Sequence, residues 1–303
     1  LFNSPFIVPE PEFTWSSKYS TKLLEKVSEI VPPKESGINK PNILLLGAAG
    51  SGKSSFINSI ATASENRKVN LVPTAANRDH VTTVLCRNKY YPAFEQYRKL
   101  EGKGGTLTNY VFADVKGLSG ADTGIHIENI MNLIQGHIKE KYEFKDDVTI
   151  PETDDCFIKL PEESDKFQCV VFVFDCRFNP STTETLMKDI FKLNSLLHNI
   201  GVPRVALLTH IDKICPKVRS DIRNTFYSKK IKEKLTRYAE VTGLPEPLFY
   251  PIKNYEDVRY PDPMTNIPLL LALEACLNSA MTYLRQELPG CSASGKLSGE
   301  SDS

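Results

Sequence analysis

The chain has 303 residues, and its 37 lysines and arginines are balanced by 37 aspartates and glutamates. A net charge of zero with 41% hydrophobic residues indicates an ordinary globular protein and excludes a globally basic nucleic-acid binder. No apolar run reaches the roughly 18 residues that a membrane-spanning helix needs, and the best candidate, 267–276, is interrupted by Glu274. The seven cysteines form no C-x-x-C pair and no metal-ligand spacing, which favours buried thiols in the reducing cytoplasm and excludes zinc.

Short apolar runs alternate with helical stripes along the chain. The proline-rich stretch up to about residue 40 carries one short helix, which ends at Pro32 and Pro33. Buried strands are expected at 42–46, 108–113, 169–174, 205–208 and 248–252, and amphipathic helices at 186–197 and 231–238. This alternation predicts an α/β fold with a mostly parallel sheet that helices cover on both faces.

The composition divides the chain into three parts. Residues 1–40 form an N-terminal helical extension, 41–288 the α/β domain, and 289–303 a tail rich in serine and glycine that we expect to be disordered. Within the domain, residues from about 139 to 166 are acidic and break the alternation of strands and helices. We interpret this segment as an inserted loop or subdomain.

The first strand leads into a glycine-rich loop, Gly47-Ala-Ala-Gly-Ser-Gly-Lys-Ser54, which matches G-x-x-x-x-G-K-[ST] and precedes a helix. Glycines let consecutive backbone N–H groups face phosphate oxygens, and the helix start adds its positive dipole end. We expect Lys53 to reach the β- and γ-phosphates and the Ser54 hydroxyl to ligate Mg²⁺. The predicted phosphate-binding residues are Gly47, Gly50, Ser51, Gly52, Lys53, Ser54 and Ser55.

The loop Thr209-His-Ile-Asp212 follows the fourth strand and indicates guanine as the base. In the [NT]-K-x-D element of GTP-binding proteins, the carboxylate accepts hydrogen bonds from guanine N1–H and the N2 amino group, and adenine cannot supply that pair. Here His210 replaces the usual lysine, so its ring could stack in place of the lysine stem or weaken the affinity. Lys253 and Asn254 follow the last strand, where such proteins place a further base-contacting loop.

The loop Asp114-Val-Lys-Gly117 closes the second strand and fits the D-x-x-G element. Its aspartate would hold Mg²⁺ through water, and the glycine N–H would sense the γ-phosphate. The threonine that ligates Mg²⁺ in such proteins has three candidates here, Thr74, Thr82 and Thr83. We choose Thr82 and Thr83, because Val84 and Leu85 follow as a short strand.

Hydrolysis of GTP needs an oriented water and charge stabilisation on the transferred phosphoryl group. Ras-like proteins have a glutamine directly after D-x-x-G, whereas this chain has the apolar Leu118. Arg78 could act as a finger in cis, but an exposed loop arginine is more often simply solvated. We therefore expect slow hydrolysis unless a homodimer or another partner supplies a group.

Together these segments resemble the interferon-induced protein 44 family, over roughly residues 15–288. The resemblance is carried by Leu44–Gly47, Gly52–Ser55, Cys169–Asp175, Val205–Asp212 and Asn254–Tyr255. It implies a cytoplasmic, interferon-induced, GTPase-like protein that is linked to antiviral responses and has a P-loop NTPase fold of the Ras-like G-domain type.

Three hypotheses for function follow. The first is a switch-type protein that binds GTP or GDP with Mg²⁺ and acts through protein partners that the sequence does not name. The second is a GTPase-like scaffold or interaction module with weak or no turnover. The third, a P-loop kinase or ATPase, is disfavoured by Asp212 and by the lack of an arginine-rich lid. Nucleic acid is not expected as a partner, because the basic run 229–234 reads as the solvated face of a helix.

Overall fold

The computed structural model describes residues 1–2, 4–6, 12–71, 107–115, 118, 125–139, 142, 144, 148–256, 258 and 260–288. Its strands are β1 Asn42–Leu46, β2 Val111–Asp114, β3 Cys169–Asp175, β4 Arg204–Thr209 and β5 Phe249–Pro251. Its α-helices are α1 Ser17–Ser28, α2 Lys53–Glu65, α4 Ile127–Ile134, α5 Glu184–Asn199, α6 Ile211–Ile214, α7 Pro216–Ser220, α8 Lys229–Thr242 and α9 Pro263–Gln286. Short 3₁₀ turns lie at Lys34–Ser36, Glu163–Asp165, Pro180–Thr183, Ile222–Tyr227 and Glu246–Leu248.

The five strands form one sheet in the order β2-β1-β3-β4-β5, and every neighbouring pair is parallel. All four leucine and isoleucine side chains of β1 and all seven residues of β3 are buried. Strands buried on both faces have continuous apolar runs, which is why the runs in the sequence located them. The expected parallel sheet is confirmed, and because all strands are parallel, their carboxyl ends meet at one edge.

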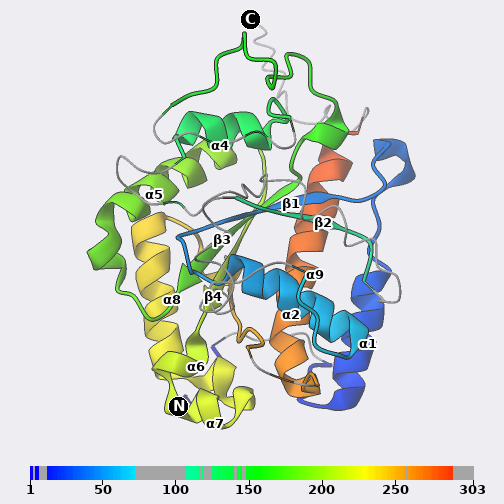
Figure 1. The fold of residues 1–303 in the computed structure, drawn as a ribbon. Helices are drawn as coiled ribbons and strands as arrows, with labels where there is room; N and C mark the ends of the chain where they lie inside the picture. The colour runs from blue at the N-terminus through cyan, green and yellow to red at the C-terminus, as the bar shows by residue number, and fades with distance from the viewer. Residues whose placement is uncertain are drawn as a thin grey trace, which may run out of the picture.

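Helices cover both faces of the sheet (Figure 1). On one face α2 packs against α9, and α1 packs against the outer side of α9; α5 and α8 pack together on the other face. In α8 the Ser228 hydroxyl accepts the N–H of Ile231 at the start, and Gly243 ends the helix with a φ of 67°. The expected α/β fold of the P-loop G-domain type is thus confirmed, with helices longer than their apolar stripes by a turn or less at each end.

The second strand begins at Val111, three residues later than the apolar run suggested. The residues before Val111 do not pair with β1 because they form hydrogen bonds to α1 and α2 instead. The Asn109 amide donates to the carbonyl oxygens of Val27 and Ile30 at the end of α1, at 2.8 and 2.6 Å. The Leu107 N–H donates to the Ser64 hydroxyl of α2 at 2.9 Å. This segment therefore ties α1 and α2 together before it enters the sheet.

The apolar run 267–276 that the sequence marked lies inside the longer helix α9. This helix has 24 residues and is the one helix within the described ranges that is long and apolar enough to cross a membrane. In the structure 72% of its most apolar window is buried inside the protein. Glu274, which interrupts the run, is also buried and pairs with Lys26 Nζ of α1 at 2.7 Å. The sequence pattern marked only the middle of a longer core helix.

The described part of the acidic segment is attached to α4. The backbone of residues 137–139 pairs with that of 156–158, and the His137 ring stacks on Phe157 with centroids 5.2 Å apart. The Asn129 side chain of α4 bonds the Val148 carbonyl at 2.6 Å and the Ile150 N–H at 2.9 Å. Whether the chain divides into the three expected parts stays a prediction, and the tail 289–303 lies outside the described residues.

Candidate functional site

The glycine-rich loop connects β1 to α2 at the carboxyl edge of the sheet. Its glycines have backbone angles or close contacts that a residue with a side chain would not tolerate. Gly50 and Gly52 have φ values of 74° and 99°, in the left-handed region that favours glycine. A Cβ on Gly47 would lie 2.4 Å from the carbonyl oxygen of Val173 in β3. The loop therefore has backbone geometry and space that match a phosphate cradle.

Lys53, the first residue of α2, lies inside this loop. Its side chain is 6% exposed, and Nζ donates to the carbonyl oxygens of Gly47 and Ala48 at 2.9 and 3.0 Å. The ammonium group is thus held beside the loop at the amino-terminal end of a 13-residue helix, where the backbone dipole favours an anion. The buried Ser51 hydroxyl has no hydrogen-bond partner within the described residues.

Two side chains from other strand ends contact the glycine-rich loop directly. The Thr209 hydroxyl lies 2.6 Å from the Ser51 carbonyl oxygen, and the Asn254 amide donates to the Gly52 carbonyl at 3.1 Å. A Cβ on Gly52 would lie only 2.9 Å from Asn254 Nδ2. Asn254 Oδ1 is buried and lacks a partner among the residues described here. The expected phosphate loop and the last expected loop are therefore parts of one site, with Lys253 half-buried beside it.

Asp212 lies in α6, just after β4, and is 8% exposed. Its nearest cation is Lys213 Nζ, 3.7 Å from Oδ2, and no described side chain or backbone group donates a hydrogen bond to its carboxylate. The Asp212 oxygens are not among the buried side-chain atoms without a hydrogen-bond partner, so they reach solvent and can accept from a ligand. A ligand that presents two N–H groups would satisfy the carboxylate, and guanine presents two.

Asp175, at the end of β3, is a site residue that sequence reasoning missed. Its side chain is 4% exposed and accepts Arg177 Nη2 at 2.6 Å and Arg177 Nε at 3.0 Å, while His210 Nδ1 lies 3.3 Å from Oδ1. Burial raises the pKa of this carboxyl, but the hydrogen bonds from His210 and Arg177 outweigh it and lower the pKa to about 2. Its place at the end of a buried strand could have marked Asp175 as a site residue. The sequence does not show, however, that β4, which leads into His210, lies beside β3.

Several expected residues fall outside the described ranges. Thr74, Arg78, Thr82 and Thr83 lie within 72–106, and Gly117 is also not described, so their roles stay predictions. Asp114 ends β2, as its position requires, but only its backbone is described. Leu118 is 5% exposed, and its N–H donates to the Gly47 carbonyl at 3.0 Å. Its side chain therefore belongs to the core.

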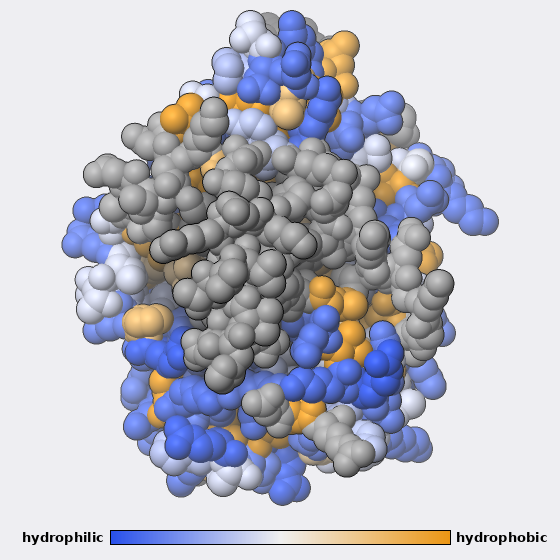
Figure 2. All heavy atoms as spheres, in the orientation of Figure 1, coloured by the Kyte–Doolittle hydropathy of each residue, from blue (hydrophilic) through white to orange (hydrophobic). Residues whose placement is uncertain are grey.

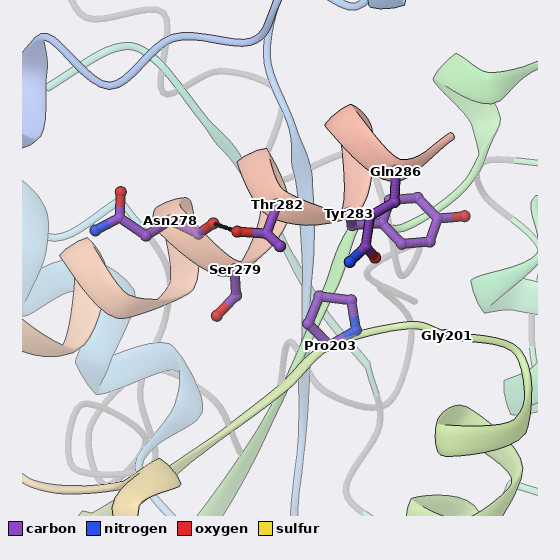
Figure 3. Close-up of a pocket in the computed structure, with 7 residues that line it drawn as sticks. All are labelled: Gly201, Pro203, Asn278, Ser279, Thr282, Tyr283 and Gln286. Carbon is purple, nitrogen blue, oxygen red and sulfur yellow. Dashed lines mark hydrogen bonds between the residues drawn. The ribbon is translucent and has the colours of Figure 1, made fainter. Parts of the chain in front are cut away.

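A separate cavity of about 270 Å³ lies between the start of β4 and the last turns of α9 (Figure 3). The start of a parallel strand faces the edge opposite to the glycine-rich loop, so this cavity is not part of the same site. Its lining residues are uncharged: Gly201, Pro203, Asn278, Ser279, Thr282, Tyr283 and Gln286. On the face drawn in Figure 2, hydrophilic residues form most of the described surface, with apolar residues in small patches.

The sheet order, the glycine-rich loop between β1 and α2, and the Thr-His-x-Asp loop after β4 together define a P-loop domain of the G-domain type. Comparison with curated proteins shows what the chain resembles. The chain is 27% identical over 257 residues to interferon-induced protein 44 of Homo sapiens and 26% identical over 255 residues to that of Mus musculus. The resemblance to the interferon-induced protein 44 family is thus confirmed.

The relatedness covers 85% of this chain but 56% of the human protein, so the chain spans little more than half the length of the curated relatives it matches. No family model matches the sequence. Among solved structures, Toc33 from Arabidopsis thaliana in complex with GDP and Mg²⁺ is 14% identical with a TM-score of 0.44, covering 89% of this chain and 97% of that one. A mutation variant of SsGBP is 17% identical with a TM-score of 0.34, covering 91% and 66%. Likeness at these levels carries no weight for function.

Proposed function

We propose that the chain binds a guanine nucleotide, GTP or GDP, together with Mg²⁺, and works as a switch-type protein with slow or partner-assisted hydrolysis. One observation supports this most directly: the phosphate loop and the base loop are bonded to each other. Thr209 contacts the Ser51 carbonyl, and Asn254 contacts the Gly52 carbonyl. A site built in this way holds the two ends of a nucleotide at a fixed spacing.

Each end of the nucleotide has its own residues in this proposal. The loop amides and Lys53 bind the phosphates, and the hydroxyl of Ser54 with the carboxylate of Asp114 would hold the metal ion. When bound, Mg²⁺ neutralises charge on the phosphate oxygens. At the other end, Asp212 accepts the two guanine N–H donors, and Asn254 Oδ1, which has no partner among the described residues, is a further acceptor.

Slow hydrolysis follows from Leu118. An apolar and buried side chain cannot orient water, so the isolated protein should hydrolyse GTP near or below the rate of about 10⁻⁴–10⁻³ per second of unassisted small GTPases. If a second copy or another partner supplies the missing group, specific activity rises with protein concentration. Activity measured over a wide range of concentrations checks this, and fast turnover at nanomolar protein would contradict it.

The alternative is a GTPase-like scaffold with weak or no turnover, and the replacement of lysine by His210 is the observation that favours it. Under either alternative, an interferon-induced, antiviral role in the cytoplasm is proposed on the family resemblance. The partner that assists hydrolysis in this proposal is either a second copy of this chain or a different protein.

Calorimetry with GTP, GDP and ATP in the presence of Mg²⁺ tests the proposed function. We expect guanine nucleotides to bind at least about tenfold more tightly than ATP, because only guanine satisfies Asp212. Equal affinity for ATP would show that the guanine assignment is wrong. A folded protein that binds none of the three would favour the scaffold.

A further inference from the structure

A chain of hydrogen bonds joins the glycine-rich loop to the end of β3 through Thr209 and His210. The Thr209 hydroxyl has one proton, and its two close carbonyl acceptors are those of Ser51 at 2.6 Å and Phe174 at 3.1 Å. In either case the proton goes to a backbone oxygen, which leaves Thr209 Oγ1 as an acceptor for its neighbour. That neighbour is His210 Nδ1, 3.0 Å away.

This arrangement determines which nitrogen of His210 carries a proton. Nδ1 faces two acceptors, Thr209 Oγ1 at 3.0 Å and Asp175 Oδ1 at 3.3 Å. Asp175 stays ionised, because its pKa is lowered to about 2, so it can only accept. Nδ1 therefore carries the proton and donates it to one of these two oxygens.

The backbone of His210 is also held in an uncommon conformation. Its φ of 56° makes it one of two residues other than glycine with positive φ in the described part of the chain. Such a conformation is strained for a residue with a Cβ and persists where surrounding contacts hold it. Here the contact with Asp175 and the start of α6 at Ile211 hold the backbone of His210 in this conformation.

The other ring nitrogen, Nε2, makes no hydrogen bond to any residue that the structure describes, and the side chain is 19% exposed. Asp175 is the charged side chain in contact with the ring, and Arg177, which pairs with Asp175, also interacts with the charges of Glu256 and Asp212. The exposed part of the ring can therefore contact a ligand.

We propose that Asp175 is a positioning residue for guanine-nucleotide binding, holding His210 in its Nδ1–H form so that Nε2 and the ring take the place of the lysine in the common [NT]-K-x-D element. The inference rests on the proposed function and deepens it. The His210 ring is oriented by its contact with Asp175, whereas a lysine at this position would not need that contact. Binding should therefore depend on Asp175 in this chain, and should lose that dependence when His210 is replaced by lysine.

A double-mutant cycle in the full chain tests this, with GTP and Mg²⁺ as the probe and calorimetry as the measurement. Asp175→Asn should weaken GTP binding about tenfold, because the charge-assisted bond that holds the ring is lost. In a His210→Lys background, the same change should alter the affinity by less than about twofold. An equal loss in both backgrounds would mean that Asp175 acts only through general stability, and would overturn the proposal.

The variant His210→Ala supplies a readout that does not need Asp175→Asn to fold. It removes the ring that Asp175 holds, so it should weaken GTP binding by about the same tenfold factor. Unchanged GTP affinity in His210→Ala would contradict the proposal.

The chain contains a matched control for these measurements. Asp221 accepts the backbone N–H, Nε and Nη2 of Arg223 with the same D-x-R spacing as Asp175 and Arg177, but has no histidine. Asp221→Asn should leave GTP affinity unchanged. A wild-type protein that fails to bind GTP refutes the proposed function itself, whereas GTP binding that is unchanged by Asp175→Asn refutes only the role of Asp175.

Discussion

The half of the site that would bind phosphate (the phosphate half) and the half that would bind guanine (the base half) use different groups of the protein. The phosphate half consists of backbone, with glycines whose φ values or close contacts exclude other residues, and one lysine. The base half consists of side chains from the ends of three strands, joined by hydrogen bonds from Thr209, His210 and Asn254. A backbone site is encoded in consecutive residues, whereas a side-chain site depends on which strands are neighbours. Four substitutions probe this difference, two in each half.

The largest effect is expected from Gly47→Ala. The added methyl group would lie 2.4 Å from the Val173 carbonyl oxygen, so β1 and β3 must separate locally. We expect the free energy of unfolding to fall by about 3 kcal/mol, the upper end of the usual cost of overpacking. Urea denaturation measures it. Gly201→Ala is the control, because its methyl group meets no atom within 4 Å and only the left-handed backbone is strained; an equal loss in both variants would contradict the steric explanation.

Asp212→Asn should lower GTP affinity about a hundredfold, because one accepting oxygen becomes a donor that faces the guanine donors. Xanthine nucleotides carry a carbonyl in place of the amino group, so they should bind the variant better than GTP does. Competition between GTP and XTP measures the change in preference. If the variant still binds GTP more tightly than XTP, as wild type should, the assignment of Asp212 to the base is wrong.

Asp175→Asn should change how the free energy of unfolding depends on pH between about 5 and 2. Because the pKa of Asp175 is lowered from 3.8 to about 2 by folding, its contribution of roughly 2 kcal/mol is present above about pH 4 and is lost as the pH falls toward 2. The variant should be less stable than wild type at pH 5 and approach it near pH 2. Thermal unfolding across this range measures the difference. Asp221→Asn, in the more exposed pair, should show a much smaller difference, and equal curves for the two variants would contradict the burial argument.

Lys53→Ala should weaken GTP binding at least tenfold, about 1.4 kcal/mol, because a charged contact to phosphate is lost. The loss should be the same for any nucleotide that binds, since the phosphate half does not distinguish bases. Calorimetry on the folded variant checks both statements. Unchanged affinity would contradict the assignment of the phosphate loop.

Much of the fold followed from the sequence because buried parallel strands and capped helices leave local patterns. The failures have physical causes. The pattern placed β2 three residues early because it does not show that Asn109 bonds to α1. It underestimated α9 because a buried Glu274 with a partner on α1 looks like an interruption. Asp175 was missed because its role depends on β3 lying beside β4, which only the sheet order reveals. The switch threonines remain predictions.

The packing of α1 against α9 has a consequence for how the chain is made. These helices come from opposite ends of the sequence, at 17–28 and 263–286, and bury Leu23 and Val27 of α1 in the common core. A ribosome releases α1, β1 and most of the sheet before α9, so one face of the sheet stays without this covering helix until residues 263–286 have been made. Nascent chains that stop before residue 263 would expose this apolar face, and such chains are natural clients for chaperones.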